Sequence, residues 1–451
     1  MRHLTIITAC LSLPAILLLG ATPAARAQPT PDNGPVLDYR TITVPELFAL
    51  TEQNSQQLKV ARAGVDVAAQ RRRVTEAQRL PNLATNLNLS YLGNPVILDT
   101  DLKEMQTVKL PHFGTTFGLK ASQAVFRGGA IRNGIERAAL DEQVAALNVS
   151  QSRADVKLLL VGRYLDMFQA YNQRAVYEKN VRQAELRVQQ AKSLVREGVI
   201  TKNEMYRLEL QLANLRLSIQ ELDNTLSVLN NQLLVTLGLP ATVMIRPDTT
   251  LLELPPAPTS LPDYLAEANQ RNFGLNLART SLQSVEKGID IARADRLPTL
   301  GLVASSNLLR PLTTVQPALD LYSRSWSAGV GIGYNISSLY TAKRTIGLAQ
   351  AQARQQREQV TLQEQNVAIE TQAAFANNRQ ARNRLGTLEQ AVALAQENYR
   401  IVEKRYANQL ALITDILDAT NARLDAELRL TNARINVLYS HYQLQRALGQ
   451  L

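Results

Sequence analysis

The hydrophobic pattern of the chain changes abruptly at two places, each marked by Arg-Leu-Pro. Before each of these sites, apolar residues recur at the three- and four-residue spacing of an amphipathic helix; after Pro81 and Pro298, apolar and polar residues alternate as in a strand. Pro45 lies 36 residues before Pro81, and Pro262 lies 36 residues before Pro298. The pattern therefore predicts an internal duplication, with a switch from helix to strand in each half.

Each half shows the same predicted order: helix, strand, loop, strand, very long helix, tight turn and return helix. The first repeat spans 45–239, a proline-rich connector covers 240–261, and the second repeat spans 262–449. The predicted strands cover about 82–92, 113–126, 299–309 and 324–337. The predicted long helices cover about 130–197 and 341–407, and the return helices cover about 202–238 and 414–448.

The return helix of the first repeat carries a heptad pattern, which is typical of a coiled coil. Its apolar residues alternate spacings of three and four: Met205, Leu208, Leu212, Leu215, Ile219, Leu222, Leu226, Leu229 and Leu233. The equivalent helix of the second repeat uses smaller residues: Ile416, Ala419, Ala426, Leu430, Ala433 and Val437. An ordinary antiparallel helical bundle would explain these helices equally well.

The four predicted strands favour a sheet that crosses a membrane. Each alternates over about ten residues, the length that a tilted strand needs to span a bilayer. Trp326 and Tyr334 fall on one apolar face, roughly 26 Å apart along a strand, and Tyr91 lies on the apolar face of the first strand. These aromatic residues match the girdles of a membrane barrel. A soluble sheet packed on helices would show the same alternation.

A sheet in lipid has to close on itself, because its edges have no water to satisfy their backbone groups. Known transmembrane barrels have eight or more strands, whereas this chain supplies four. If the strands cross a membrane, several copies of the chain must therefore join to form one barrel.

The first residues have the features of a secretory signal peptide, which we place at 1–27. Arg2 precedes an apolar run, and Ala25-Arg26-Ala27 matches the small-x-small cleavage pattern. Cys10 follows only about six apolar residues and the run continues beyond it, which argues against a lipid anchor there. Residues 28–44 are expected to form an extended segment. After the signal, no run of eighteen apolar residues occurs, so no transmembrane helix is expected.

Residues with catalytic or metal-binding chemistry are scarce in the chain. Cys10 is its single cysteine, and His112 and His441 are the only histidines beyond the signal. We therefore expect no metal site, no cofactor and no enzymatic activity. The formal net charge is +10, but the basic residues are scattered along helices without interleaved aromatic residues, so a nucleic-acid partner is not expected.

In this organisation the chain resembles the TolC-type outer-membrane efflux proteins, the outer-membrane factor family. The resemblance rests on the duplication, the order of elements, "VFRGGAIRNGIERA" at 125–138 and "RYANQLALITDILDAT" at 405–420. It implies a mainly α protein with a transmembrane β-barrel. Three copies would form a homotrimer, whose twelve strands make one barrel in outer-membrane lipid and whose helices continue as a long periplasmic α-helical barrel.

The resemblance also implies a function and partners. The trimer would be the passive, porin-like exit duct of a tripartite efflux or type I secretion system. A periplasmic adaptor (membrane-fusion) protein would connect it to an inner-membrane pump of the resistance-nodulation-division or ABC type. A different class of function remains open, a periplasmic coiled-coil scaffold or adaptor protein without a membrane barrel.

The resemblance implies a periplasmic gate at the turn between the second long helix and its return helix. Tyr406 matches the tyrosine of the gating network, Asp415 and Asp418 match an acidic pair facing the axis, and Glu204 occupies the acidic position of the first half. Six carboxylates from three copies would attract cations. Alternatively, the two aspartates complement the dipole of their helix, and Thr201 and Glu204 form a capping box.

Two positions depart from the pattern of the family. Its turn glycine is kept as Gly198 in the first half but is Gln409 in the second, and a gate-linking arginine is replaced by Ala411. The closed state is therefore expected to be held differently.

The two tight turns are predicted to form a tip where the adaptor docks. The predicted docking residues are Gly198, Val199, Ile200, Leu410 and Leu412. The apolar members of this set would equally suit packing within the turns themselves.

Overall fold

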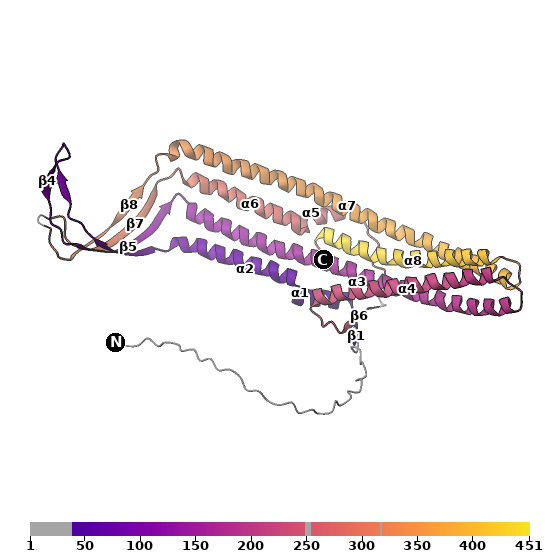
Figure 1. Ribbon diagram of the computed structural model, residues 1–451. Helices are drawn as coiled ribbons and strands as arrows, with labels where there is room; N and C mark the ends of the chain where they lie inside the picture. The colour runs from indigo at the N-terminus through magenta and orange to yellow at the C-terminus, as the bar shows by residue number, and fades with distance from the viewer. Residues whose placement is uncertain (1–37, 249–253, 316–317) are drawn as a thin grey trace, which may run out of the picture.

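The computed structural model describes residues 38–248, 254–315 and 318–451. The predicted signal peptide lies outside the described residues. The chain is long, narrow and mainly helical, with a β-sheet at one end, helices side by side in the middle and two helical hairpins at the other end (Figure 1).

The first half of the chain contains two short helices, a pair of long strands and a pair of long helices. They are α1 (Val44–Asn54), α2 (Gln56–Glu76), β2 (Asn82–Tyr91), β5 (Phe113–Arg127), α3 (Ala130–Arg196) and α4 (Lys202–Leu237). A single 3-10 turn follows α2, and a small hairpin connects β2 to β5. The turn is Ala77–Arg79, and the hairpin consists of β3 (Val96–Leu98) and β4 (Glu104–Thr107).

The second half has the same order of elements. They are α5 (Leu261–Arg271), α6 (Phe273–Ala294), β7 (Thr299–Arg310), β8 (Ser323–Gly333), α7 (Ser338–Ala407) and α8 (Ile413–Leu448). Two further short strands lie near the middle of the molecule. They are β1 (Asp38–Ile42) and β6 (Val243–Pro247).

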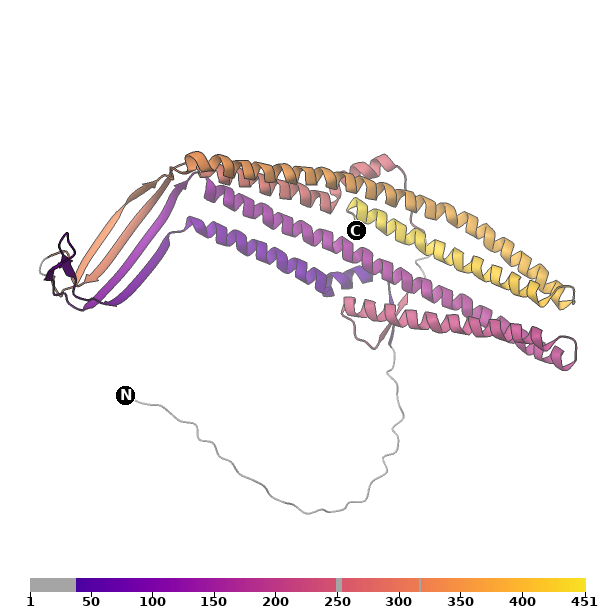
Figure 2. The ribbon, with the colours of Figure 1, turned by 45° about the horizontal axis from the view of Figure 1, so that its top comes forward.

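The four long strands form one antiparallel sheet in the order β2-β5-β7-β8. The helices α2, α3, α6 and α7 continue from these strands and pack beside one another in the same order (Figure 2). Farther from the sheet, α4 lies beside α3, and α8 packs against both α3 and α7. The helices α3 and α7 contain 67 and 70 residues. Each is therefore about 100 Å long and runs through the whole helical part.

The strand registers place the apolar residues of all four strands on one face of the sheet. Leu87 lies opposite Phe117, which lies opposite Leu308, and Leu302 lies opposite Val330. Leu87 and Val330 are 63% and 64% exposed, so the helices of this chain do not cover the face. We call these residues and their neighbours on the same side the apolar face.

The opposite side of the sheet, which we call the polar face, carries small and polar residues. A Cβ atom built on Gly118 would lie 2.5 Å from the Asn86 side chain and 3.2 Å from that of Asn307. The Oγ atoms of Ser305 and Ser327 lie 2.9 Å apart on the same side. Glycine thus makes room for amide side chains that reach across neighbouring strands.

The bounds predicted for the last strand and the long helix after it were wrong by three to four residues. The strand β8 ends at Gly333 and α7 begins at Ser338, so Tyr334 lies in the turn between them. The backbone N–H of Ser337 donates to the Asn335 side chain (3.2 Å), and that of Ser338 donates to the Asn335 carbonyl (2.9 Å). An asparagine that bonds the following backbone favours a turn, and this local preference ends the strand early.

Each half begins with two helices where the pattern predicted one, because the backbone is extended at Ser55 and at Asn272. An asparagine at each break donates to the last turn of a return helix: the half-buried Asn54 to the Leu237 carbonyl (2.8 Å), and the buried Asn272 to the Ala447 carbonyl (3.0 Å). These tertiary hydrogen bonds compensate for the interruption of the helix.

The segments 28–44 and 240–261, expected to be extended, include two paired strands. The strand β1 pairs in parallel with β6, and α1 already begins at Val44. This small sheet packs against α3, where the Tyr164 hydroxyl donates to the Ile42 carbonyl (2.6 Å). The Asn230 side chain of α4 bonds the two residues that flank Met244. It donates to the Val243 carbonyl and accepts from the Ile245 N–H, each at 2.9 Å. The sheet thereby joins the N-terminal segment to the connector at the centre of the largest apolar core.

Candidate functional site at the helical tip

Both hairpins of the tip turn in the same way. After α3, Gly198 has a φ of 76°, and the Val199 N–H donates to the Leu194 carbonyl (2.9 Å). After α7, Gln409 has a φ of 62°, and the Leu410 N–H donates to the carbonyl five residues before it (2.7 Å). This is the Schellman arrangement, which requires a left-handed residue and is usually made by glycine. Gln409 therefore occupies a strained backbone conformation.

Two of the predicted gate carboxylates cap the helices that follow these turns. Glu204 accepts from the Thr201 N–H (2.8 Å), and its own N–H donates to the Thr201 hydroxyl (3.3 Å). Asp415 accepts from the Leu412 N–H (2.9 Å). Both carboxylates thus satisfy backbone donors at a helix N-terminus. Asp418 lies one turn farther along α8, and it is exposed like Asp415.

A groove of about 1050 Å³ separates the two hairpins at the tip. Some of the predicted residues line it: Glu204, Tyr406, Val199, Ile200 and Leu412. Others lie at the tip outside the groove wall: Gly198, Leu410, Asp415 and Asp418. The structure therefore brings the predicted tyrosine and the acidic residue of the first half together, and leaves the aspartate pair apart from them.

Tyr406 projects partly into the groove from α7. Burial raises the pKa of its hydroxyl, the negative charge of Glu204 raises it further, and the positive charge of Arg187 opposes the shift. The phenol is therefore a neutral hydrogen-bond donor at physiological pH. Ala411 lies on the wall of the same groove and offers no polar group there.

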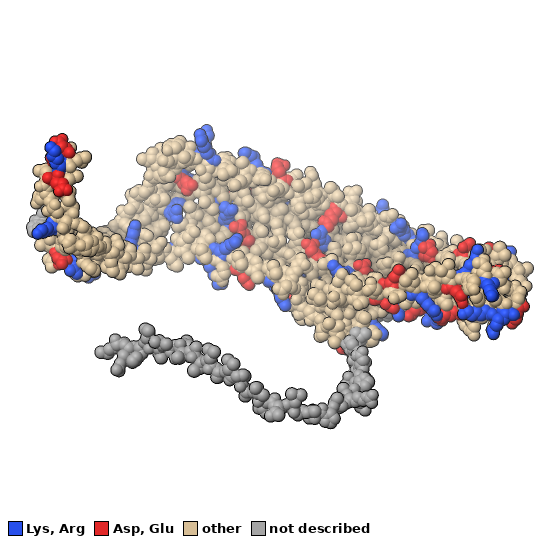
Figure 3. Space-filling model, in the orientation of Figure 1, with Lys and Arg blue, Asp and Glu red and all other residues tan. Residues whose placement is uncertain are grey.

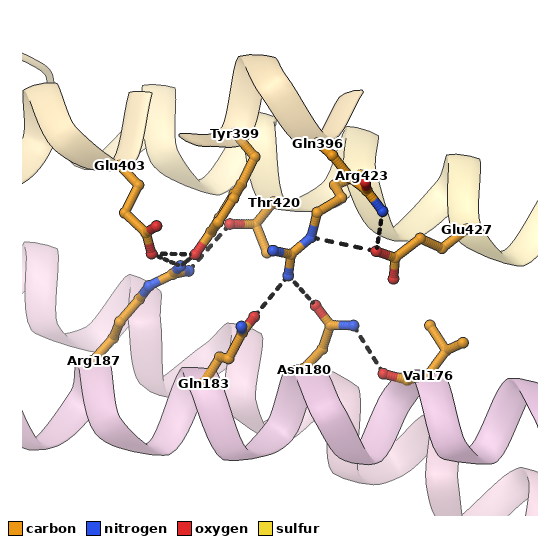
Figure 4. A network of polar contacts seen from close by, with 10 residues as sticks. All are labelled: Val176, Asn180, Gln183, Arg187, Gln396, Tyr399, Glu403, Thr420, Arg423 and Glu427. Atoms are coloured by element: carbon orange, nitrogen blue, oxygen red, sulfur yellow. Dashed lines mark hydrogen bonds and ion pairs between the residues drawn. The ribbon is translucent and has the colours of Figure 1, made fainter. Parts of the chain in front are cut away.

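A polar network that includes the groove-lining residues Gln183, Arg187, Tyr399 and Glu403 connects α3 to α7 and α8 (Figure 4). Arg187 of α3 hydrogen-bonds the Tyr399 hydroxyl, donates to the Thr420 hydroxyl (3.1 Å) and forms an ion pair with Glu403 (3.4 Å). The Tyr399 hydroxyl in turn donates to Glu403. Burial raises the pKa of Tyr399, and the hydrogen bond to Glu403 adds to this shift.

Arg423 of α8 is the most buried charge in this network, with only 5% of the residue exposed. Its guanidinium donates to the side-chain oxygens of Asn180 (3.0 Å) and Gln183 (2.7 Å), both on α3. The guanidinium carbon also lies 3.9 Å from the centre of the Tyr399 ring, and Glu427 is 3.9 Å from Nε. Tyr399 therefore lies between two arginines that come from different hairpins.

This network was not among the predicted site residues. A signal for it exists in the heptad pattern of the second return helix, where the seam residues Ala419 and Ala426 are seven apart. Position 423 between them should be apolar, and an arginine stands there. A charged residue at a seam position indicates a specific polar partner on the facing helix.

The predicted girdle residues lie at the two ends of the sheet. Tyr91 and Trp326 lie near the end away from the helices, Trp326 on the apolar face and 78% exposed, and Tyr91 stacks on His112 with ring centres 5.1 Å apart. Tyr334 lies at the helical end and is 44% exposed.

No group of three or more His, Cys, Asp or Glu residues in the part of the chain that the structure describes is placed to hold a metal ion. No described helix is both long and apolar enough to cross a membrane.

An open antiparallel sheet that continues into a layer of very long helices is the architecture of outer-membrane channel proteins. The chain superimposes with a TM-score of 0.75 on the CmeC outer membrane channel of Campylobacter jejuni, at 16% identity and over 90% of this chain and 85% of that one. The open state of the MtrE outer membrane channel of Neisseria gonorrhoeae gives a TM-score of 0.71 at 18% identity, over 90% and 88% of the two chains.

The sequence assigns the family. The chain belongs to the outer membrane efflux protein family, whose model matches residues 47–239 and 264–450. It is 23% identical over 410 residues to the outer membrane efflux protein BepC of Brucella suis, which covers 88% of this chain and 83% of BepC. The expected resemblance to TolC-type proteins and the outer-membrane location are confirmed.

Proposed function

We propose that three copies of this chain form the passive exit duct of a tripartite efflux or type I secretion system. The observation that carries the proposal is the four-stranded sheet, which has an exposed apolar face and, among the described strands, no partner at the outer edge of β2 or β8. Both features are unfavourable in water and favourable in a closed barrel in lipid. Twelve strands from three copies supply that closure.

The helical layer supports the same assembly. At one edge of the layer, α2 exposes a valine at every seventh residue: Val60, Val67 and Val74. At the opposite edge, α7 exposes Leu348, Leu362 and Ile369. Stripes with this spacing are typical of helices that pack along their length. Because the stripes lie on opposite edges, packing α7 of one copy against α2 of the next generates a ring.

The tip is the proposed gate and docking site. Asp415 and Asp418 of three copies would surround the axis at the periplasmic end and attract cations. Val199, Leu410 and Leu412 expose apolar side chains around the groove, which suits the helices of a periplasmic adaptor. The adaptor would link the duct to an inner-membrane pump of the resistance-nodulation-division or ABC type, which supplies the energy.

The alternative of a periplasmic scaffold without a barrel has less support. It would account for the long helices and the heptads, but it leaves the apolar face exposed to water. An exposed apolar surface that extends over four strands marks an interaction with lipid or protein.

Substitutions on the two faces of one strand test the proposal. Val330→Asp places a charge on the apolar face of β8 at a cost of up to about 3 kcal/mol in lipid, whereas Ser327→Asp places the same charge on the polar face. We expect wild type and S327D in the outer-membrane fraction as heat-modifiable trimers that conduct in planar bilayers, and V330D in neither form. Recovery of the wild type as a soluble monomer without detergent, or equal behaviour of the two variants, would contradict the proposal.

A further inference from the structure

The four long strands have an unusual charge composition. They contain no aspartate or glutamate, and their charged residues are all basic: Lys120, Arg127, Arg310 and Arg324. In the space-filling view, the strands form a mostly uncharged surface, and acidic and basic side chains alternate over the helices (Figure 3). Any charge that the sheet contributes is therefore positive.

The strand registers divide these four residues between the two faces. Arg310 pairs with Thr115, and Arg324 pairs with Leu308, which places both arginines on the apolar face at the end away from the helices. Arg310 is also neutralised by a bidentate contact to Asp320, at 2.7 and 3.0 Å. These positions suit the rim of a lipid-facing surface.

The other two basic residues lie on the polar face. Lys120 is in the middle of β5, between Ala84 on one neighbouring strand and Ser305 on the other. Arg127 pairs with Thr299 and lies on the same face, at the end of β5 next to the helices. Both side chains are exposed, and neither takes part in an ion pair within the described part of the chain.

The surroundings of Lys120 leave its charge uncompensated. Its neighbours on the polar face are glycine, serine, asparagine and alanine residues, and the nearest side chains across the sheet hydrogen-bond one another, as Ser305 and Ser327 do. Lys120 is the longest side chain on the central part of this face. It is therefore the group that extends farthest from the wall.

We propose that Lys120 and Arg127 form two cationic rings on the inner wall of the assembled barrel and select for anions and anionic cargo. This inference rests on the proposed function, since three copies turn each residue into a ring of three positive charges. Rings of lysine or arginine favour anions in pores. The barrel then has the opposite charge preference from the tip, where Asp415 and Asp418 favour cations.

The size of the effect follows from Coulomb's law. Three charges about 10 Å from the pore axis, in water and at about 0.1 M salt, change the ratio of cation to anion permeability roughly fourfold. Removing one ring should raise that ratio by this factor. Charge reversal at the same position should raise it by about the square of the factor.

The test is the reversal potential of single channels in planar bilayers under a KCl gradient. It uses the full-length trimer in a D415N/D418N background, so that the tip contributes little charge. We expect K120Q and R127Q each to shift the reversal potential toward cations, K120E to shift it farther, and K120R to behave as the parent. The matched control is R324Q, which removes the same charge from the apolar face and should leave selectivity unchanged.

The outcomes distinguish a failure of the proposed exit duct from a failure of the cationic rings. If the wild type forms no channels, the proposed function fails. If all variants form heat-modifiable trimers with normal conductance, but K120Q and R127Q shift the reversal potential no more than R324Q does, the duct stands and the cationic rings are refuted.

Discussion

The replacement of Arg423 by alanine is the sharpest test of how the two hairpins are held together. Arg423 lies in the seam between α8 and α3, and its guanidinium makes the hydrogen bonds to Asn180 and Gln183 described above. The substitution removes both bonds, leaves the buried amide oxygen of Asn180 and the half-buried one of Gln183 without this donor, and removes the cation–π contact with Tyr399.

Each hydrogen bond from a charged group contributes about 1.5–3 kcal/mol, and a desolvated cation–π contact contributes up to about 2 kcal/mol. Burying the arginine costs several kcal/mol in desolvation, which the substitution returns. The net loss expected for R423A is therefore about 3 kcal/mol, confined to the contact between the hairpins.

Native-state hydrogen exchange measures this loss locally. Peptides covering residues 396–430 should exchange about a hundredfold faster in R423A than in the wild type, while peptides from the sheet are unchanged. The control is R429A on the same helix, which breaks an exposed i,i+4 ion pair with Asp425 and should cost less than about 1 kcal/mol. Equal exchange in R423A and R429A would refute the claim that the buried network holds the hairpins together.

Three further predictions concern the tip and the centre of the chain. Gln409→Gly relieves the left-handed strain and should stabilise the second turn by about 1 kcal/mol, whereas Gly198→Ala should destabilise the first by a similar amount; thermal dissociation of the trimer compares the two. D415N/D418N should reduce cation preference and divalent block of single channels, and unchanged selectivity would show that the pair lies off the axis. Burial lowers the pKa of His441 below its usual 6.5 or so, with a smaller effect from a nearby arginine. The unfolded chain then binds the proton more readily, so stability should fall as pH drops below about 6.5, and less so in His441→Gln, as chemical denaturation at pH 5 and 7 would show.

The long elements could be predicted because their patterns are strong and local. Period-two alternation after Pro81 and Pro298 defined the strands, and the lack of proline defined the long helices. The alignment of Leu87, Phe117 and Leu308 on one face required the register, which depends on pairing between strands far apart in the sequence.

The features that were missed depend on tertiary contacts. The break at Asn272 has a local signal, because this side chain caps α6 by accepting from the Leu275 N–H (3.1 Å). Its donation to a carbonyl 175 residues away could not be predicted from any one segment. The pairing of β1 with β6 likewise joins segments some 200 residues apart. In the candidate site, the resemblance pointed to Tyr406 and Glu204, but the contacts of Arg187 depend on how two hairpins pack, which no single segment encodes.

The departures at Gln409 and Ala411 acquire a physical meaning from the polar network of Arg187, Tyr399 and Arg423, part of which lines the same groove. The Ala411 side chain cannot connect the hairpins through a hydrogen bond. The basic groups that do so, Arg187 and Arg423, lie on α3 and α8 farther from the turns. Because these contacts lie away from the tip, the two turns are free to separate while the buried contacts between the hairpins persist. Opening of this tip should therefore need less free energy at the turns than at the level of Tyr399, where two arginines and a ring must be exposed to water together.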